Sequence, residues 1–191
     1  MMTLTKPLLV LGISGSLREA SYNTALLHAA VDLMPQGMKL DIFDLSPLPM
    51  FNQDLEKPFP EAVVAFRDRL VKADAILIAA PEYNSSITAV LKNTIDWVSR
   101  PVPGEAPLAC FDGKAACIMS ASPGALGGLR GLVHVRAILQ NIRVLVLPDQ
   151  IAIVKADEAF NPDGSLKDPK QQAAVEALGA KLARVIAKLH G

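Results

Sequence analysis

The chain has 191 residues, of which 51% are hydrophobic and 20% are charged. These proportions are typical of a soluble α/β protein with a substantial core, and they exclude a largely disordered chain. The formal net charge is +0, because 19 basic residues balance 19 acidic ones. This balance argues against a general nucleic-acid-binding protein, which would present a basic face.

The cysteines and histidines argue against a metal centre. Cys110 and Cys117 do not form a Cys-x-x-Cys pair, and Cys117 lies inside an apolar strand pattern, so we interpret it as a buried, inert thiol. The three histidines (His28, His134 and His190) are scattered along the chain. The N-terminus lacks the layout of a signal peptide, and no segment reaches membrane-spanning length. We therefore expect a cytoplasmic protein with no metal and no membrane partner.

The first apolar run, Leu8 to Ile13, has the length and composition of a buried strand. It is followed by a loop of small hydroxyl residues that carries one cation, Arg18, and then by a helical pattern from about Asn23 to Met34. The start of a helix leaves amide groups unpaired and carries a positive partial charge, so this order of elements favours an anion site. The spacing matches neither a P-loop nor Gly-x-Gly-x-x-Gly. The alternative is a turn whose serines only cap the helix.

Strands and helices alternate along the rest of the chain. Further strands are predicted at Leu40–Phe43, Asp74–Ala80, Lys114–Met119 and Arg143–Leu147. Further helices are predicted from Pro60 through Val71 and at Thr88–Val98, Gly127–Gln140 and Pro169–His190, with long loops at Ser46–Asp54 and Pro101–Pro107. Five alternating pairs predict a doubly wound α/β sheet in a single domain spanning residues 1–191.

Ligands of such sheets lie at the carboxyl ends of the strands, where the strand order reverses. In the flavodoxin order 2-1-3-4-5 this point lies between the first and third strands, so we expect the loops after the first, third and fourth strands to meet at one pocket. Tyr83 lies among amides and hydroxyls in the second of these loops, which suits a flat heteroaromatic ring, although a helix-capping turn with a surface tyrosine is the alternative. Glycines in the third loop, Ser120–Gly128, allow close approach to a ligand or make a flexible junction.

Three strings of residues resemble the signatures of the NADPH-dependent FMN reductase family, which includes quinone, chromate and azo-dye reductases. They are Gly15-Ser-Leu-Arg-Glu-Ala-Ser-Tyr-Asn23, Pro81-Glu-Tyr-Asn-Ser-Ser-Ile-Thr-Ala-Val-Leu-Lys-Asn-Thr-Ile-Asp-Trp97 and Ser120-Ala-Ser-Pro-Gly-Ala-Leu-Gly-Gly128. The resemblance implies a flavodoxin-like five-stranded parallel sheet of order 2-1-3-4-5 with helices on both faces. It also implies noncovalent FMN, NADPH as co-substrate, and a homodimer or homotetramer.

The resemblance assigns site residues by position. It places the FMN phosphate on Ser16, Arg18, Ser21, Asn23 and Thr24. The isoalloxazine ring is flanked by Pro81, Glu82, Tyr83, Asn84 and Ser85, and closed on the other side by Ser120, Ser122 and Gly124. Ser85 departs from the Gly or Tyr that family members often have there, which leaves ring stacking and substrate access open. Arg100 and Arg18 are candidates for the 2′-phosphate of NADPH, with a surface or subunit-contact role as the alternative for Arg100.

The implied reaction passes hydride from NADPH through flavin N5 to a small acceptor: free flavin, a quinone, chromate or an azo compound. It needs no side-chain acid or base, and Glu82 is expected to act through its main chain. A flavodoxin-type electron carrier is the main alternative, although such carriers are typically strongly acidic. A flavin-free regulatory domain on the same fold is a third hypothesis.

Overall fold

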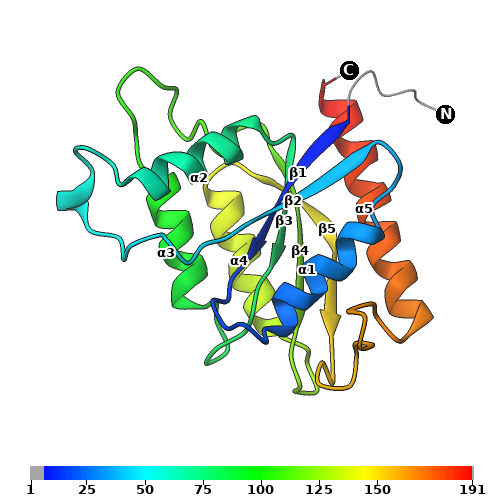
Figure 1. The fold of residues 1–191 in the computed structure, drawn as a ribbon. Coiled ribbons are helices and arrows are strands. Elements are labelled where there is room, and N and C mark those ends of the chain that lie inside the picture. Colours follow the sequence, from blue (N-terminus) through cyan, green and yellow to red (C-terminus); the bar gives the residue numbers. More distant parts are fainter. Residues whose placement is uncertain (1–6, 191) are drawn as a thin grey trace.

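The computed structural model describes residues 7–190, which form a parallel five-stranded sheet of order β2-β1-β3-β4-β5 (Figure 1). This confirms the expected flavodoxin-like order. The strands are β1 (Leu8–Ser14), β2 (Met38–Phe43), β3 (Ala75–Ala79), β4 (Ala115–Ala121) and β5 (Leu145–Ile153). The helices are α1 (Tyr22–Asp32), α2 (Glu61–Lys72), α3 (Ala89–Val98), α4 (Leu129–Asn141) and α5 (Pro169–His190), with a short 3-10 helix at Gln53–Leu55.

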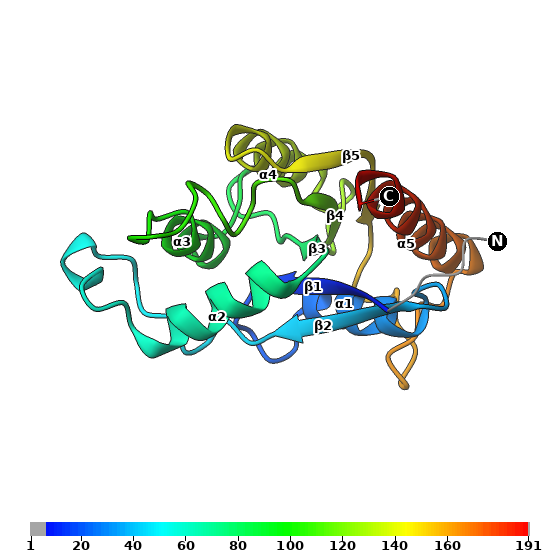
Figure 2. The same ribbon diagram turned by 90° about the horizontal axis from the view of Figure 1, so that it is seen from above.

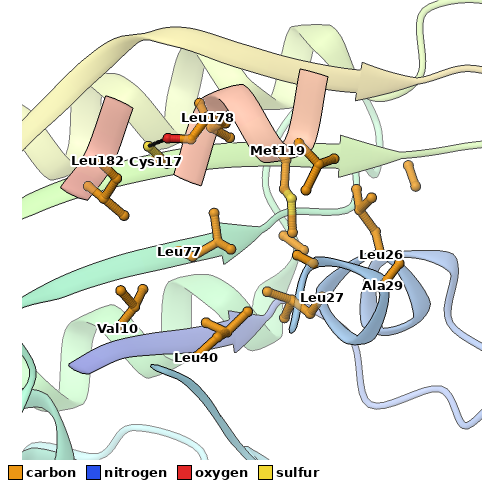
Figure 3. Close-up of a cluster of buried hydrophobic side chains, with 14 of the residues drawn as sticks. Val10, Leu26, Leu27, Ala29, Leu40, Leu77, Cys117, Met119, Leu178 and Leu182 are labelled. Carbon is orange, nitrogen blue, oxygen red and sulfur yellow. Dashed lines mark hydrogen bonds between the residues drawn. The ribbon is translucent and has the colours of Figure 1, made fainter. Parts of the chain in front are cut away.

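The helices cover both faces of the sheet. Figure 2 shows α1 and α5 on one side and α2, α3 and α4 on the other. Successive side chains of a strand point to opposite faces, so β1 sends Val10 into the first layer and Leu11 into the second. Every residue of β3 is buried, because this central strand is covered on both faces. Figure 3 shows the first layer, where Cys117 of β4 packs against Leu178 and Leu182 of α5.

Two parts of the sequence prediction for the core were wrong. The spacing of apolar residues in the sequence groups Val71 with Leu70 on the second helix and Leu189 with Ile186 on the last, which predicts that both are buried. Each is 49% exposed instead. Val71 lies two helical turns after Val64, which is 44% exposed, whereas its neighbour Leu70 is fully buried, so Val71 is on the solvent side of α2. Leu189 lies in the last turn of α5, beyond the buried Ile186. The apolar pattern therefore placed Val71 on the wrong side of α2 and did not show where burial ends along α5.

Strand β5 is longer than predicted and continues past Leu147 to Ile153. Its pairing with β4 shifts register beyond Ala116, where Pro148 interrupts the apolar pattern. A proline is tolerated there because β5 is an edge strand. The guanidinium of Arg136 on α4 binds the carbonyl oxygens of the irregular segment, at 3.3 Å from Val146 and 2.7 Å from Leu147.

The long loop between β2 and α2 is held against α3. The Pro49 carbonyl accepts hydrogen bonds from Asn93 Nδ2 at 2.9 Å and from Trp97 Nε1 at 2.7 Å. Phe51 lies edge-on to the Trp97 ring, with 4.9 Å between the ring centroids. Over residues 7–190, none of the helices combines the length and apolar character that a membrane crossing requires.

Candidate functional site

The loops that follow β1, β3 and β4 begin side by side. Ser14 pairs with Ala79, and Ala79 pairs with Met119, so the three strands end at one edge of the sheet. A Cβ added to Gly15 would lie 2.9 Å from Cδ of Pro81, which shows that the first two loops are in contact. The three loops therefore start at one edge of the sheet, as the expected strand order requires.

The first loop presents the N-terminus of α1. Ser21 caps this helix, its Oγ accepting a hydrogen bond from Thr24 N at 3.3 Å. Amides of the first turn have no carbonyl partners within the helix, so they are available to an anion. Arg18 lies beside them, its guanidinium 5.2 Å from the centroid of the Tyr22 ring. The loop therefore brings together amides, hydroxyls and one cation, the donor set that a phosphate group requires.

Two of the residues predicted at the phosphate use their side chains inside the protein. Asn23 is buried and binds both backbone groups of Ala121: its Nδ2 donates to the carbonyl at 2.9 Å and its Oδ1 accepts from the amide at 3.0 Å. The hydroxyls of Thr24 and Ser14 lie 2.8 Å apart. The Asn23 side chain thus joins α1 to the end of β4, and its backbone amide is the group that faces the loop.

The second loop contains a tight turn. Tyr83 and Ser86 exchange two backbone hydrogen bonds of 3.0 Å, and the residues between them, Asn84 and Ser85, have φ angles of 52° and 64°. Two consecutive positive φ angles are those of a type I′ turn, in which glycine is favoured. Ser85 adopts this conformation although glycine is the residue that the turn favours at its position. The Tyr83 side chain is 57% exposed, and Tyr83 is not among the residues that line the hollow beside the turn.

A hollow of 280 Å³ lies between the second and third loops. It is lined by Glu82, Asn84, Ser85, Ser122, Arg130 and the segment 124–128. A larger hollow of 620 Å³ lies between α1 and residues 163–166, but none of the predicted site residues lines it. The smaller hollow brings together predicted residues of the second and third loops, whereas the first loop, expected at the same pocket, contributes no lining residue.

Ser120 lies beneath this hollow. Its side chain is fully buried, its Oγ has no hydrogen-bond partner among residues 7–190, and a Cβ added to Gly128 would lie only 1.9 Å from that oxygen. Gly128 itself has a φ of 90°. Ser120 therefore supports the glycine turn from below, whereas Ser122 and Gly124 line the hollow itself.

Glu82 does more than its predicted main-chain role. Its carboxylate accepts hydrogen bonds from the backbone amides of Arg130 at 3.0 Å and Gly131 at 3.2 Å, and from Arg130 Nε at 2.7 Å. Burial alone would raise the pKa of this carboxyl group, but the donors from Arg130 and Gly131 outweigh burial and lower the pKa. Glu82 is thus an ionised cap on the first turn of α4.

Arg130 is a site residue that sequence reasoning missed. It lies two residues beyond the third motif, in the first turn of the helix, and its side chain is 59% exposed. A signal was present, because a glutamate in one motif and an arginine just after another belong to loops predicted to meet.

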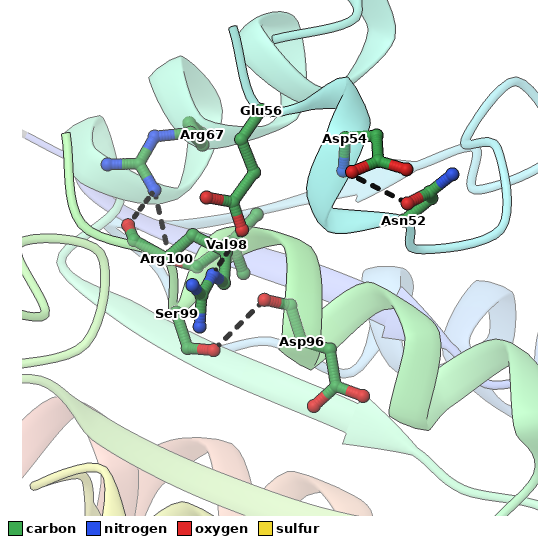
Figure 4. A network of polar contacts seen from close by, with 8 residues as sticks. All are labelled: Asn52, Asp54, Glu56, Arg67, Asp96, Val98, Ser99 and Arg100. Atoms are coloured by element: carbon green, nitrogen blue, oxygen red, sulfur yellow. Dashed lines mark hydrogen bonds and ion pairs between the residues drawn. The ribbon is translucent and has the colours of Figure 1, made fainter.

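Arg100 lies apart from the other predicted residues. It follows α3, whose ten residues span about 15 Å from the site edge of the sheet. Its Nε donates to the Glu56 carboxylate at 2.5 Å, and its backbone carbonyl accepts from Arg67 at 3.2 Å (Figure 4). Within one chain, the structure does not bring Arg100 to the three loops.

Comparisons with known proteins address this geometry directly. The family model for NADPH-dependent FMN reductases matches residues 8–158, which include all three loops. The chain belongs to the NADPH-dependent FMN reductase family. It is 42% identical over 184 residues to an NAD(P)H-dependent FMN reductase of Pseudomonas aeruginosa, covering 95% of this chain and 97% of that protein. It is 36% identical to an NADPH:quinone oxidoreductase of Arabidopsis thaliana over 198 residues, covering 99% and 97%.

A solved structure agrees with this membership. The flavoenzyme FerB of Paracoccus denitrificans, an NAD(P)H:(acceptor) oxidoreductase, superposes with a TM-score of 0.83 at 29% identity, covering 94% of this chain and 97% of that chain. As a member of the FMN reductase family, this chain is an oxidoreductase that uses FMN as cofactor and NAD(P)H as electron donor. The donor set of the first loop and the hollow between the other two fit the charged tail and the ring of that cofactor.

Proposed function

We propose that the first loop holds the FMN phosphate and that the hollow between the second and third loops holds the ring. The main supporting observation is the contact between Gly15 and Pro81, which places the first loop against the start of the loop whose following residues line the hollow. Arg18 is the cation for the phosphate, and Ser16 and Ser21 supply hydroxyls. Asn23 and Thr24 position the helix terminus.

On the ring side, the free amides of Asn84 and Ser85 bind the polar edge of the ring, and Ser122 and Gly124 close the opposite side. The amides of Asn84 and Ser85 belong to a turn whose own hydrogen bonds are already made, so they are held rigidly and need little rearrangement on binding. Pro81 fixes the start of the turn against Gly15. FMN held by these residues would supply the hydride-transfer chemistry between NAD(P)H and the second substrate.

We propose a quinone as the second substrate. Relatives from Arabidopsis thaliana and Solanum tuberosum are quinone oxidoreductases, and one from a Burkholderia species is a 2-hydroxy-1,4-benzoquinone reductase. The hollow is open to solvent and no acid or base side chain is required, so free flavin, chromate and azo compounds are further candidate acceptors.

The test is a reduction assay with purified FMN-loaded protein. We expect rapid NADPH consumption with benzoquinone as acceptor and no partner protein, and alternate binding of the two substrates gives ping-pong kinetics. NADH, free FMN, chromate and an azo dye in the same assay rank donors and acceptors. Turnover that requires an added electron-transfer protein would instead favour the carrier hypothesis.

We also propose that the protein forms homodimers or homotetramers in the cytoplasm. Tyr83, Leu126, Leu129 and Val133 are all at least 40% exposed and lie on or beside the loops of the site. Apolar side chains gathered around a hollow favour contact with another protein surface. Light scattering after size-exclusion chromatography measures the oligomer, and a monomer at micromolar concentration would contradict this proposal.

A further inference from the structure

A carboxylate lines the hollow that we assign to the flavin ring. The Glu82 side chain is only 8% exposed, and it lies among the residues of that hollow with Asn84 and Ser85. A hydride carries two electrons and one proton, so its transfer from NAD(P)H leaves NAD(P)⁺ and adds one negative charge to the ring. An unbalanced carboxylate beside the ring would oppose that step.

The first turn of α4 balances this carboxylate. Arg130 approaches Glu82 Oε1 with both Nε, at 2.7 Å, and Nη2, at 2.5 Å. The other oxygen, Oε2, accepts hydrogen bonds from the backbone amides of Arg130 and Gly131, which belong to the positive end of the helix dipole. One oxygen of the carboxylate is therefore paired with a guanidinium, and the other is hydrogen-bonded to a helix N-terminus.

Further contacts fix the geometry of this pair. A Cβ added to Gly131 would lie 3.2 Å from the Ser86 carbonyl oxygen and 3.3 Å from Glu82 Cβ, so α4 packs directly against the turn. One helical turn further on, His134 Nδ1 lies 2.8 Å from Ser86 Oγ. The turn is thus attached to α4 at both of its ends, through Glu82 and through Ser86, so the carboxylate is held beside the first turn of the helix.

We propose that Arg130 raises the reduction potential of the bound flavin by neutralising Glu82. This inference rests on the proposed ring position and adds a role for a residue outside the three motifs. Arg130 acts through Glu82, so it is a positioning and charge-balancing residue rather than a catalytic one. Its guanidinium makes the ring side of the hollow neutral instead of negative.

The test removes the two charges of the pair singly and together. The measured quantity is the two-electron midpoint potential of the FMN-loaded protein. Arg130→Ala leaves the carboxylate unbalanced, and we expect the equilibrium constant for reduction to fall about tenfold, a shift of about −30 mV. Glu82→Gln leaves the guanidinium unopposed, and we expect a shift of the opposite sign. The double variant restores balance, with a potential close to that of the wild type. Arg130→Lys keeps the charge and is expected to stay close to the wild type.

Arg69→Ala is the matched control, because Arg69 also pairs with a carboxylate, that of Asp41, but near the C-terminal end of α2. Its potential is expected to equal that of the wild type. Should Arg130→Ala fail to hold FMN, Glu82→Gln and Arg130→Lys still decide the outcome. Shifts of the same sign in Arg130→Ala and Glu82→Gln, or no shift in either, would overturn the inference. If the wild-type protein does not consume NADPH with benzoquinone, that result would instead contradict the proposed function.

Discussion

Asn23, at the start of α1, exchanges two hydrogen bonds with the backbone of Ala121, at the end of β4. The two residues are 98 positions apart in the sequence. This amide bridge ties the first loop to the third across the intervening strand β3, so the two walls of the site are held at a fixed spacing. Asn23, a residue expected at the phosphate, uses its side chain for this bridge.

Replacing Asn23 with Ala is expected to lower the free energy of unfolding by about 2–3 kcal/mol, because it leaves the buried amide and carbonyl of Ala121 without partners. FMN affinity is expected to fall as well, since the loops are no longer held together. Urea denaturation and titration of the apoprotein with FMN measure the two effects. Asn141→Ala, at the exposed end of α4, is the control and should change stability by less than about 0.5 kcal/mol. Unchanged FMN affinity in Asn23→Ala would contradict the bridging role.

Replacing Arg18 with Ala is expected to weaken FMN binding about 10- to 100-fold, the value of one charged hydrogen bond of about 1.5–3 kcal/mol. Riboflavin lacks the phosphate, so its affinity should not change, and this comparison separates a phosphate contact from a general role in the loop. Fluorescence quenching of each flavin on binding is the measurement. Equal weakening for FMN and riboflavin would show that Arg18 supports the loop and does not bind phosphate.

The sequence predicted most of the fold because the strands are buried on both faces and therefore appear as apolar runs. The second half of β5 was missed because Pro148 and Asp149 break the run, and the segment is held instead by Arg136 from another element. Such support depends on tertiary contacts, which the local pattern does not contain.

The position of the site was predictable for a related reason: topology alone brings the ends of β1, β3 and β4 together. The directions of the side chains at the site could not be predicted in this way. Asn23 turns toward Ala121, Ser120 lies under Gly128, and Glu82 reaches Arg130 48 residues away. Arg100 follows the second motif closely in sequence, yet the length of α3 separates it from the loops.

Gly128 is predicted to be irreplaceable, whereas Gly124 should tolerate alanine. At Gly128 the backbone φ is 90° and a Cβ would lie 1.9 Å from Ser120 Oγ, so Ala adds both strain and a clash. We expect a loss of about 2 kcal/mol or more in stability, with weaker FMN binding. At Gly124 the nearest atom, Ser122 Oγ, would be 3.6 Å from the new Cβ, which is ordinary contact. Chemical denaturation of both variants compares them, and equal costs would contradict this account of the turn.

Cys117 is expected to make the protein less stable in alkali. Burial in β4 raises the pKa of its thiol from 9.0 to about 12. Between these values the unfolded chain releases the thiol proton while the folded chain keeps it. The contribution of the Cys117 thiol to the free energy of unfolding is therefore fully present below pH 9 and is lost as the pH rises toward 12. The loss is about 1.4 kcal/mol per pH unit above pH 9. Cys117→Ala lacks this contribution, so the stability advantage of the wild type over the variant should be about 2 kcal/mol smaller at pH 10.5 than at pH 8. Urea denaturation of both proteins under reducing conditions at the two pH values measures this difference, and a constant difference would mean that the thiol ionises without unfolding.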